Sequence, residues 1–136
     1  MNGNGRPQAA VMIVDDEEMV IASLKALLQL ETDYDIRSFS DPEEAARHAE
    51  GNPVDVVVSD YLMPKMNGIQ LLARIKELQP EASRVLLTGH ADKQSAIQAI
   101  NQAALFQYLE KPWDNSQLLL VLKSAAERTR LFRDLR

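Results

Sequence analysis

Charged or hydroxyl side chains stand at the ends of several short apolar runs of this sequence. Asp15 and Asp16 close the first run, Asp60 follows three consecutive valines, and Thr88 and Lys111 end two later runs. Carboxylate oxygens in a cluster favour Mg²⁺, and a carboxylate can also attack phosphorus to form an aspartyl phosphate. Phosphoryl transfer mainly requires positioning and charge neutralisation, which a hydroxyl and a compact ammonium can supply. If these side chains meet, they predict a magnesium-dependent phosphoryl-transfer site.

The apolar runs predict the strands that must position these residues. The expected strands are residues 9–16, 34–39, 54–59, 84–88 and 105–111, and helical patterns separate them. Residues 56–58 are all valine, which is typical of a strand covered on both faces. Strands that alternate with helices imply right-handed crossovers and a parallel sheet with helices on both faces. The carboxyl ends of such strands lie along one edge, where open α/β sheets bind ligands, so we expect the charged residues to converge there.

Capping residues mark the starts of three expected helices. Asp41 precedes a proline, Asn67 precedes an apolar helical pattern, and Asp114 stands three residues before Gln117. Side chains of this kind accept hydrogen bonds from the free N–H groups of a first helical turn. Asn67 is better placed than Asp60 to cap its helix, which leaves the Asp60 carboxylate for chemistry.

Composition limits the class of protein. The 136 residues suit a single domain, and 46% hydrophobic with 26% charged residues is ordinary for a soluble globular chain. A net charge of −5 argues against direct nucleic-acid binding. The absence of cysteine excludes disulfides and thiolate metal sites and fits a reducing compartment. No apolar run approaches the roughly 18 residues that span a bilayer, so we expect a cytoplasmic protein with no membrane contact.

Four motifs together resemble the receiver domain of bacterial two-component response regulators, of the CheY-like superfamily. They are "IVDDEE", "SDYLMPKMNG", "LLTGH" and "YLEKPW", and the resemblance covers roughly residues 11–131. Each motif alone is weak, but all four in the family's order and spacing are specific. The resemblance implies a doubly wound (βα)₅ fold with a five-stranded parallel sheet in the flavodoxin-like order 2-1-3-4-5.

The resemblance also implies roles for the site residues. Asp60 would be the phosphoacceptor, and Thr88 and Lys111 would contact the phosphoryl group. Mg²⁺ would be held by Asp15, Asp16, Asp60 and the backbone carbonyl of Leu62. The Lys111–Pro112 peptide bond would be cis.

A conformational switch would follow from phosphorylation. Thr88 and Tyr108 would be its moving parts, and they would change the surface of the fourth helix, fifth strand and fifth helix. The phosphoryl group would come from a sensor histidine kinase or a phosphotransfer protein. The changed surface would meet an output domain or a second copy of the chain. Leu62 and His90 would flank the path of the water that removes the phosphoryl group.

The competing class is an enzyme, a magnesium-dependent phosphatase that forms an aspartyl phosphate. A phosphatase of the haloacid dehalogenase type requires D-x-D-G-T on its first strand and a cap domain. This chain has "VDDEE" and is too short for a cap. A nucleotide switch would require a phosphate-binding glycine loop, which none of the 5 glycines forms. We therefore expect a signalling switch that phosphorylates and dephosphorylates only itself, at Asp60.

The sequence also predicts the domain limits and the placement of three further residues. We expect a flexible tail at residues 1–8, a receiver domain at 9–127 and a helical extension at 128–136 that could link to an output domain. We expect His90 to be exposed and non-catalytic, His48 to lie on the surface, and Trp113 to anchor the last helix.

Overall fold

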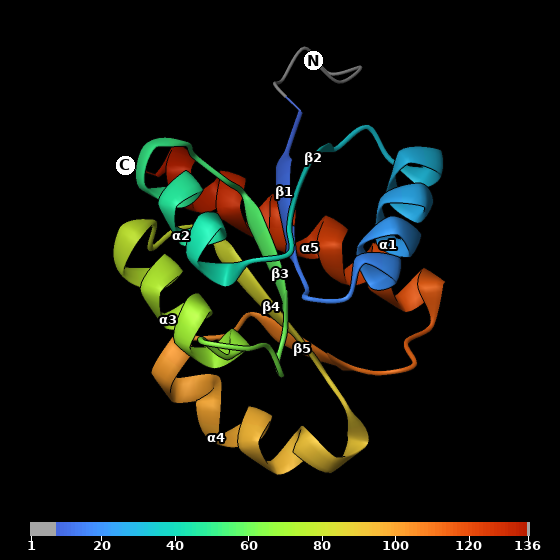
Figure 1. The fold of residues 1–136 in the computed structure, drawn as a ribbon. Coiled ribbons are helices and arrows are strands. Elements are labelled where there is room, and N and C mark those ends of the chain that lie inside the picture. Colours follow the sequence, from blue (N-terminus) through green and yellow to red (C-terminus); the bar gives the residue numbers. More distant parts are fainter. Residues whose placement is uncertain (1–7, 136) are drawn as a thin grey trace.

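The computed structural model describes residues 8–135, apart from the side chains of residues 98 and 99. Strands and helices alternate along the chain (Figure 1). In chain order they are β1 (Ala10–Val14), α1 (Glu18–Glu31), β2 (Asp35–Phe39), α2 (Pro42–Gly51), β3 (Val56–Asp60), α3 (Gly68–Leu78), β4 (Ser83–Thr88), the 3₁₀ helix η1 (His90–Asp92), α4 (Lys93–Ala103), β5 (Gln107–Glu110) and α5 (Asn115–Asp134). The expected tail lies outside the described residues, except for the exposed Gln8.

The five strands form one parallel sheet in the order β2-β1-β3-β4-β5. This order confirms the predicted doubly wound fold. The strand expected at residues 34–39 lies at one edge of the sheet as β2, and β5 is shorter than the predicted run at 105–111. The three valines of β3 lie in the middle of the sheet and are buried on both faces.

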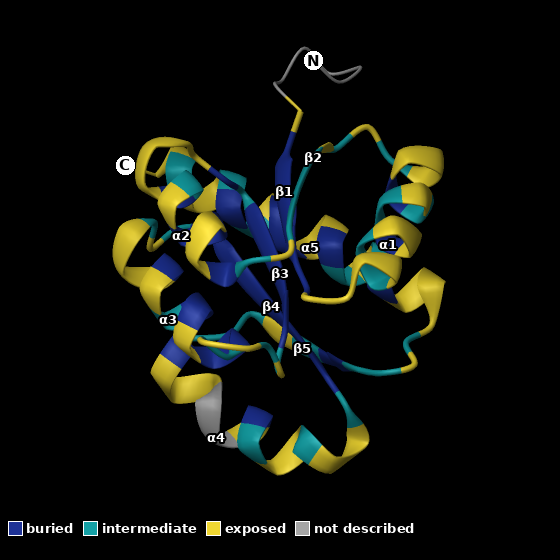
Figure 2. Ribbon diagram, in the orientation of Figure 1, coloured by how far each residue is buried: buried dark blue, intermediate teal, exposed yellow. Residues whose placement is uncertain are grey.

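Two apolar cores cover the two faces of the sheet (Figure 2). Alternate residues of a strand point to opposite faces. Met12 and Val14 of β1 therefore pack with α2, α3 and α4, whereas Val11 and Ile13 pack with α1 and α5. Figure 1 shows the same division, with α1 and α5 on one side of the sheet and α2, α3 and α4 on the other.

The three predicted helix caps are all present. Asp41 Oδ1 accepts a hydrogen bond from the Glu43 N–H at 2.9 Å. Asn67 and Gln70 form a reciprocal capping box, each side chain accepting from the other's backbone N–H at 2.9 Å. Asp114 Oδ1 accepts from the Gln117 N–H at 3.1 Å. Asn67 therefore caps α3, and the Asp60 carboxylate is not used for that purpose.

Helix α4 is held to the sheet by small side chains. Ala96 and Ala103 are buried, whereas Ile97 and Ile100 remain 43% and 39% exposed. The expected helix is present, but it buries these alanines and leaves the larger isoleucines partly exposed. Alanines let the helix approach the sheet closely, and the isoleucines turn toward the outside as a result.

His48 corrects one prediction. We expected a surface residue, but the ring is only partly exposed and lies against Phe39, with 5.2 Å between the ring centroids. Its Nε2 lies 3.1 Å from an Arg37 nitrogen. Burial and then the neighbouring Arg37 charge lower the pKa of His48 below its usual value. The charged pattern of α2 concealed this because α2 packs directly on the edge strand β2.

Helix α5 continues past residue 127 without a break. Thr129 is buried and donates its hydroxyl to the Asp55 carbonyl at 2.6 Å. Arg133 lies 2.5 Å from the Asp55 carboxylate and donates to the Val54 carbonyl at 2.8 Å. The secondary structure does not change at the predicted domain boundary at residue 127. That boundary stays a prediction. Within residues 8–135, no helix has the length and apolar character that crossing a membrane requires.

Candidate functional site

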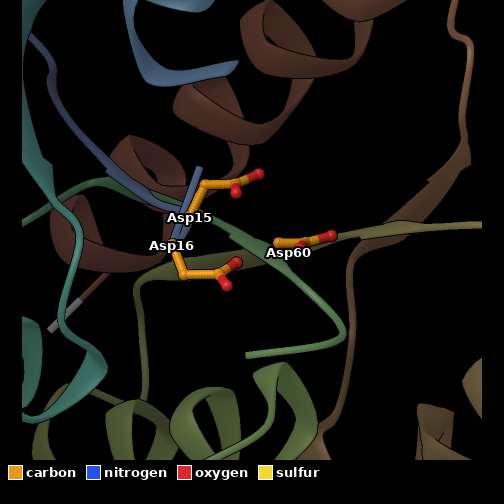
Figure 3. Close-up of side chains that lie close together, drawn as sticks. All are labelled: Asp15, Asp16 and Asp60. Carbon is orange, nitrogen blue, oxygen red and sulfur yellow. The ribbon is translucent and has the colours of Figure 1, made fainter. Parts of the chain in front are cut away.

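Three carboxylates meet at the carboxyl edge of the sheet (Figure 3). Asp15 and Asp16 follow β1, and Asp60 is the last residue of the neighbouring strand β3. One oxygen from each carboxylate lies within 4.8 Å of the others, a spacing that suits a shared cation. Asp15 and Asp60 are buried and Asp16 is exposed, so the cluster opens to solvent on the Asp16 side.

Asp15 carries the least satisfied oxygen of the cluster. Its Oδ1 accepts a hydrogen bond from the Glu17 N–H at 2.9 Å. Its Oδ2 is buried and has no hydrogen-bond partner within the described part of the chain. Burial raises the pKa of Asp15; the Glu17 N–H opposes this rise, and the Asp60 charge adds to it. A buried carboxylate oxygen that accepts no hydrogen bond fits the donor set of a divalent cation.

Lys111 is the cation that faces these carboxylates. Its Nζ lies 2.8 Å from Asp60 Oδ1 and 3.6 Å from Asp15 Oδ2. Burial lowers the pKa of Lys111, but the hydrogen bond and charge of Asp60, with the charges of Asp15 and Glu17, outweigh it and hold the pKa above its usual value. The expected cis Lys111–Pro112 bond is present. Trp113, just beyond it, is half-buried against the core beneath α5, as expected of an anchor.

Gly68 lets the Asp60 backbone pack against the start of α3. A Cβ atom at Gly68 would lie 2.1 Å from the Asp60 carbonyl oxygen and 2.9 Å from Leu86 Cδ1. The Gly68 N–H also donates to the Tyr61 carbonyl at 2.8 Å. The "NG" of the motif thus has two local functions: the asparagine caps the helix, and the glycine makes room for the strand end.

Thr88 and Tyr108 lie on the same face of the sheet. Tyr108 pairs with Leu86 and Thr88 with Glu110 across β4 and β5, so the two side chains are diagonal neighbours. The Thr88 side chain is buried and donates to the Gly89 carbonyl at 3.1 Å. Tyr108 is half-buried and packs on the core beneath α3 and α4.

A small pocket opens over Asp60. Its lining residues are Asp16, Glu17, Asp60, Tyr61, Leu62, Gly89, Asp92 and Lys111. Leu62 is 62% exposed at its rim. His90 is exposed as predicted, and its Nδ1 lies 2.5 Å from Glu110 Oε1.

Two residues of the pocket were not predicted from the sequence. Glu17 and Asp92 both add carboxylates to the lining. Glu17 directly follows the two predicted metal ligands, so its position was a usable signal. Asp92 lies four residues beyond Thr88, in a turn that no apolar pattern marks.

The fold and the site define a class of protein: a doubly wound α/β domain with an acidic centre and one lysine at the carboxyl edge of its sheet. Residues 11–123 match the response regulator receiver domain family, and the chain belongs to that family. It is thus a receiver domain of the two-component response regulators, whose receivers are signalling switches and not ordinary enzymes.

Relatives of this chain include transcriptional regulators. It is 30% identical over 124 residues to the hydrogenase transcriptional regulatory protein HoxA of Bradyrhizobium diazoefficiens, covering 91% of this chain and 25% of HoxA. It is 30% identical over 122 residues to the C4-dicarboxylate transport regulator DctD of Rhizobium meliloti, covering 90% of this chain and 26% of DctD. The chain thus spans about a quarter of the length of these relatives.

Solved structures of receiver domains are also similar to this chain. The signal receiver domain of an HD domain-containing protein from Pseudomonas fluorescens Pf-5 has a TM-score of 0.85 and 35% identity, covering 91% of this chain and 98% of that one. A response regulator receiver domain from Clostridium thermocellum has a TM-score of 0.84 and 32% identity, with the same two coverages of 91% and 98%. The predicted family and fold are confirmed, and these relatives do not favour the phosphatase alternative.

Proposed function

We propose that this domain accepts a phosphoryl group on Asp60 and that the modified site changes the surface formed by α4, β5 and α5. One observation carries the proposal. Asp60 lies at the carboxyl edge of the sheet, with Lys111 Nζ at 2.8 Å and the Asp15 and Asp16 carboxylates beside it. That arrangement supplies a nucleophile, a cation for a phosphoryl oxygen and a set of oxygen ligands.

The residues present fit Mg²⁺. Asp15, Asp16 and Asp60 would hold the ion, with the backbone carbonyl of Leu62 as a further ligand. The buried Oδ2 of Asp15 supports this assignment, because it accepts no hydrogen bond and Lys111 Nζ approaches it only to 3.6 Å. When bound, Mg²⁺ would neutralise negative charge on the carboxylates and on the transferring group.

The side chains of the site have separate roles in phosphoryl transfer and in hydrolysis of the phosphoryl group. An Asp60 carboxylate oxygen forms the new bond to phosphorus, while the bond between phosphorus and the donor's leaving group breaks and the leaving group keeps the electron pair. Lys111 and the Thr88 hydroxyl contact the phosphoryl oxygens. Loss of the group reverses the modification: water attacks phosphorus, the bond to Asp60 breaks, and inorganic phosphate leaves. Leu62 and His90 flank the path of that water.

Thr88 and Tyr108 would carry the signal away from Asp60. The new phosphoryl charge attracts the Thr88 hydroxyl, which gives up its contact with the Gly89 carbonyl. This movement vacates space on the face of the sheet that the two residues share, and Tyr108 turns inward to fill it. A partner that binds one Tyr108 state more tightly then reads the signal.

The partners follow from the family. The donor would be a sensor histidine kinase or a phosphotransfer protein in the cytoplasm. The changed surface would contact an output domain or a second copy of the chain. Relatives named as transcriptional regulators support an output domain, whereas the acidic net charge of this chain argues against its binding nucleic acid directly.

Phosphorylation at Asp60 can be tested directly. The protein is incubated with acetyl phosphate and Mg²⁺, and the mass increase and its position are measured by mass spectrometry. The wild type and Asp33→Asn, a control at the opposite edge of the sheet, should gain one phosphoryl group; Asp60→Asn should gain none. A phosphoryl group on Ser59, Thr88 or a histidine would refute the proposal.

The metal and the switch need separate measurements. A Mg²⁺ titration followed by Trp113 fluorescence and amide NMR should shift residues around Asp16 and Asp60. Beryllofluoride should then change the environment of the Tyr108 ring in the wild type. If Tyr108 keeps a single rotamer with and without beryllofluoride, the proposed switch is wrong even when Asp60 is phosphorylated.

A further inference from the structure

The carboxylate of Asp92 is turned toward the mouth of the Asp60 pocket. Asp92 ends η1 and directly precedes α4, a position where aspartate commonly caps a helix. Its side chain makes no capping hydrogen bond. Its Oδ2 lies 3.5 Å from the place that a Cβ atom on Gly89 would occupy, and both residues line the pocket. The carboxylate thus folds back over Gly89 and away from the first turn of α4.

The Asp92 charge has no partner within the described part of the chain. No hydrogen bond or ion pair involves its carboxylate. Asp92 is also outside the carboxylate cluster that could hold a cation, which consists of Asp15, Asp16 and Asp60. Mg²⁺ in that cluster would therefore leave the Asp92 charge facing the pocket.

The pocket lining carries more negative than positive charge. Four of its residues carry carboxylates, namely Asp16, Glu17, Asp60 and Asp92, and Lys111 is the single cation among the lining residues. The Lys111 ammonium is already paired with Asp60 at 2.8 Å. Asp16 and Glu17 enter from the end of β1, whereas Asp92 faces them from the β4 side. A phosphoryl donor that reaches Asp60 therefore enters a pocket whose lining carries this negative charge.

Short contacts hold the Asp92 turn in place. The Lys111 N–H donates to the Thr88 carbonyl at 2.8 Å, which joins the ends of β4 and β5. Beside this contact, His90 Nδ1 lies 2.5 Å from Glu110 Oε1, the last residue of β5. The Asp92 N–H donates to the Gly89 carbonyl at 3.1 Å, which closes the turn itself. The backbone of the turn is thus held in place, and it carries the Asp92 side chain at the lining of the pocket.

We propose that Asp92 is a specificity-determining residue for the phosphoryl donor. Its negative charge disfavours small donors in proportion to their own negative charge. It thereby favours a donor whose phosphoryl group arrives on a protein that can offset the charge with its own cationic side chains. This inference rests on the proposed phosphorylation of Asp60 and adds a selection step at the entrance of the same site.

The test compares two small donors of different charge. Near neutral pH, acetyl phosphate is a dianion and phosphoramidate a monoanion. Phosphorylation rates are measured at saturating Mg²⁺ for the wild type, Asp92→Asn and the distant surface control Asp33→Asn. Coulomb's law for one unit charge near a solvated pocket predicts that Asp92→Asn speeds acetyl phosphate about threefold to tenfold and phosphoramidate about twofold. Both factors should shrink as salt rises, and Asp33→Asn should match the wild type.

Each outcome separates the inference from the function on which it rests. A wild type that takes no phosphoryl group from either donor would overturn both. Slower phosphorylation of Asp92→Asn would mean that Asp92 assists metal or donor binding, which overturns the inference alone. The same factor for both donors, or a factor independent of salt, would show a structural effect and would also overturn it. Asp92→Lys should extend the trend with a larger factor than Asp92→Asn.

Discussion

Asp60 Oδ1 and Lys111 Nζ lie 2.8 Å apart although α3, β4, η1, α4 and β5 separate the two residues along the chain. The same ammonium lies 3.6 Å from Asp15 Oδ2. One cation thus faces two buried carboxylates, and no other Lys, Arg or His among the described residues pairs with either of them. The electrostatics of the metal-free site depend on this lysine.

Removing Lys111 should therefore destabilise the metal-free protein. Breaking one partner of a largely buried pair costs about 3–5 kcal/mol, and partial exposure of Lys111 reduces the expected loss for Lys111→Met to about 2 kcal/mol. Saturating Mg²⁺ should restore part of that stability, because the metal replaces the missing positive charge. Urea unfolding with and without Mg²⁺ measures both effects. Lys123→Met, at an exposed position on α5, is the matched control and should change stability by less than about 0.5 kcal/mol. A Lys111→Met protein as stable as this control would contradict the prediction.

Asp15→Asn should have the opposite effect on the metal-free protein. The wild-type residue holds a buried charged oxygen with no hydrogen-bond partner, and such a group costs roughly 1–3 kcal/mol. We expect the variant to be more stable than the wild type without metal by about 1 kcal/mol. It should also lose most of the stabilisation that Mg²⁺ gives. Thermal unfolding across a Mg²⁺ series tests both statements, and a variant that keeps the full Mg²⁺ effect would remove Asp15 from the metal site.

The difference in stability between metal-free Asp15→Asn and the metal-free wild type should depend on pH in a predictable direction. Burial raises the pKa of Asp15 above its ordinary value of 3.8, so the folded state binds this proton more readily than the unfolded state. The resulting contribution to stability is complete below pH 3.8 and is lost as pH rises through the raised pKa. The advantage of Asp15→Asn over the wild type should therefore grow with pH across this window. Urea unfolding of both metal-free proteins at several pH values measures it, and an advantage that shrinks with pH would show that the sign is wrong.

The convergence of Asp15, Asp16, Asp60 and Lys111 was predictable from the sequence for a physical reason. Local signals place each residue at a strand end, and a parallel sheet brings the carboxyl ends together. The helix caps were predictable because Asp41, Asn67 and Asp114 act within their own first turn. The family resemblance, and not the local pattern, supplied the order of the strands and the cis bond.

Features that depend on packing between distant elements were not predictable. His48 stands on a charged helix, and its partial burial results from the contact of α2 with β2. Ile97 and Ile100 follow a helical pattern, yet the small Ala96 and Ala103 are the residues that α4 buries. The direction of the Asp92 carboxylate depends on a turn that sequence periodicity does not describe. These features follow from contacts between elements that are distant in the sequence, and sequence periodicity does not describe such contacts.

Gly68 offers a test of how the strand end is positioned. A Cβ atom there would lie 2.1 Å from the Asp60 carbonyl oxygen, which is backbone and cannot move aside as a flexible side chain could. Gly68→Ala should destabilise the domain by about 1–3 kcal/mol, as overpacking does, and should slow phosphorylation by displacing Asp60. Gly51→Ala is the control, because nothing lies within 4 Å of its added Cβ and alanine is the better helix former. Equal stability of the two variants, measured by urea unfolding, would show that α3 and β3 are not packed as closely as described.

Arg84 anchors the carboxyl end of α4 to the start of β4. Its side chain is only 3% exposed and donates hydrogen bonds to carbonyls at the end of α4 and before β4. The acceptors are Ala103 at 2.9 Å, Ala104 at 3.3 Å, Pro80 at 3.3 Å and Ala82 at 2.8 Å. Burial and then the charge of Arg128 lower the pKa of this guanidinium. A cation at the carboxyl end of α4 also faces the negative end of the helix dipole.

Arg84→Met should therefore loosen the end of α4 that lies far from Asp60. The substitution leaves buried carbonyls without donors, at a cost of about 2–4 kcal/mol. Hydrogen exchange should speed up most at the carboxyl end of α4 and at the turn before β5, while β1 and β3 change only with global stability. Arg74→Met removes a surface pair with Glu50, in which the arginine side chain is 43% exposed, and should cost no more than about 1 kcal/mol. If both arginine variants show the same small loss and α4 keeps its protection in each, then the alanine contacts alone hold that helix, and Arg84 is not its anchor.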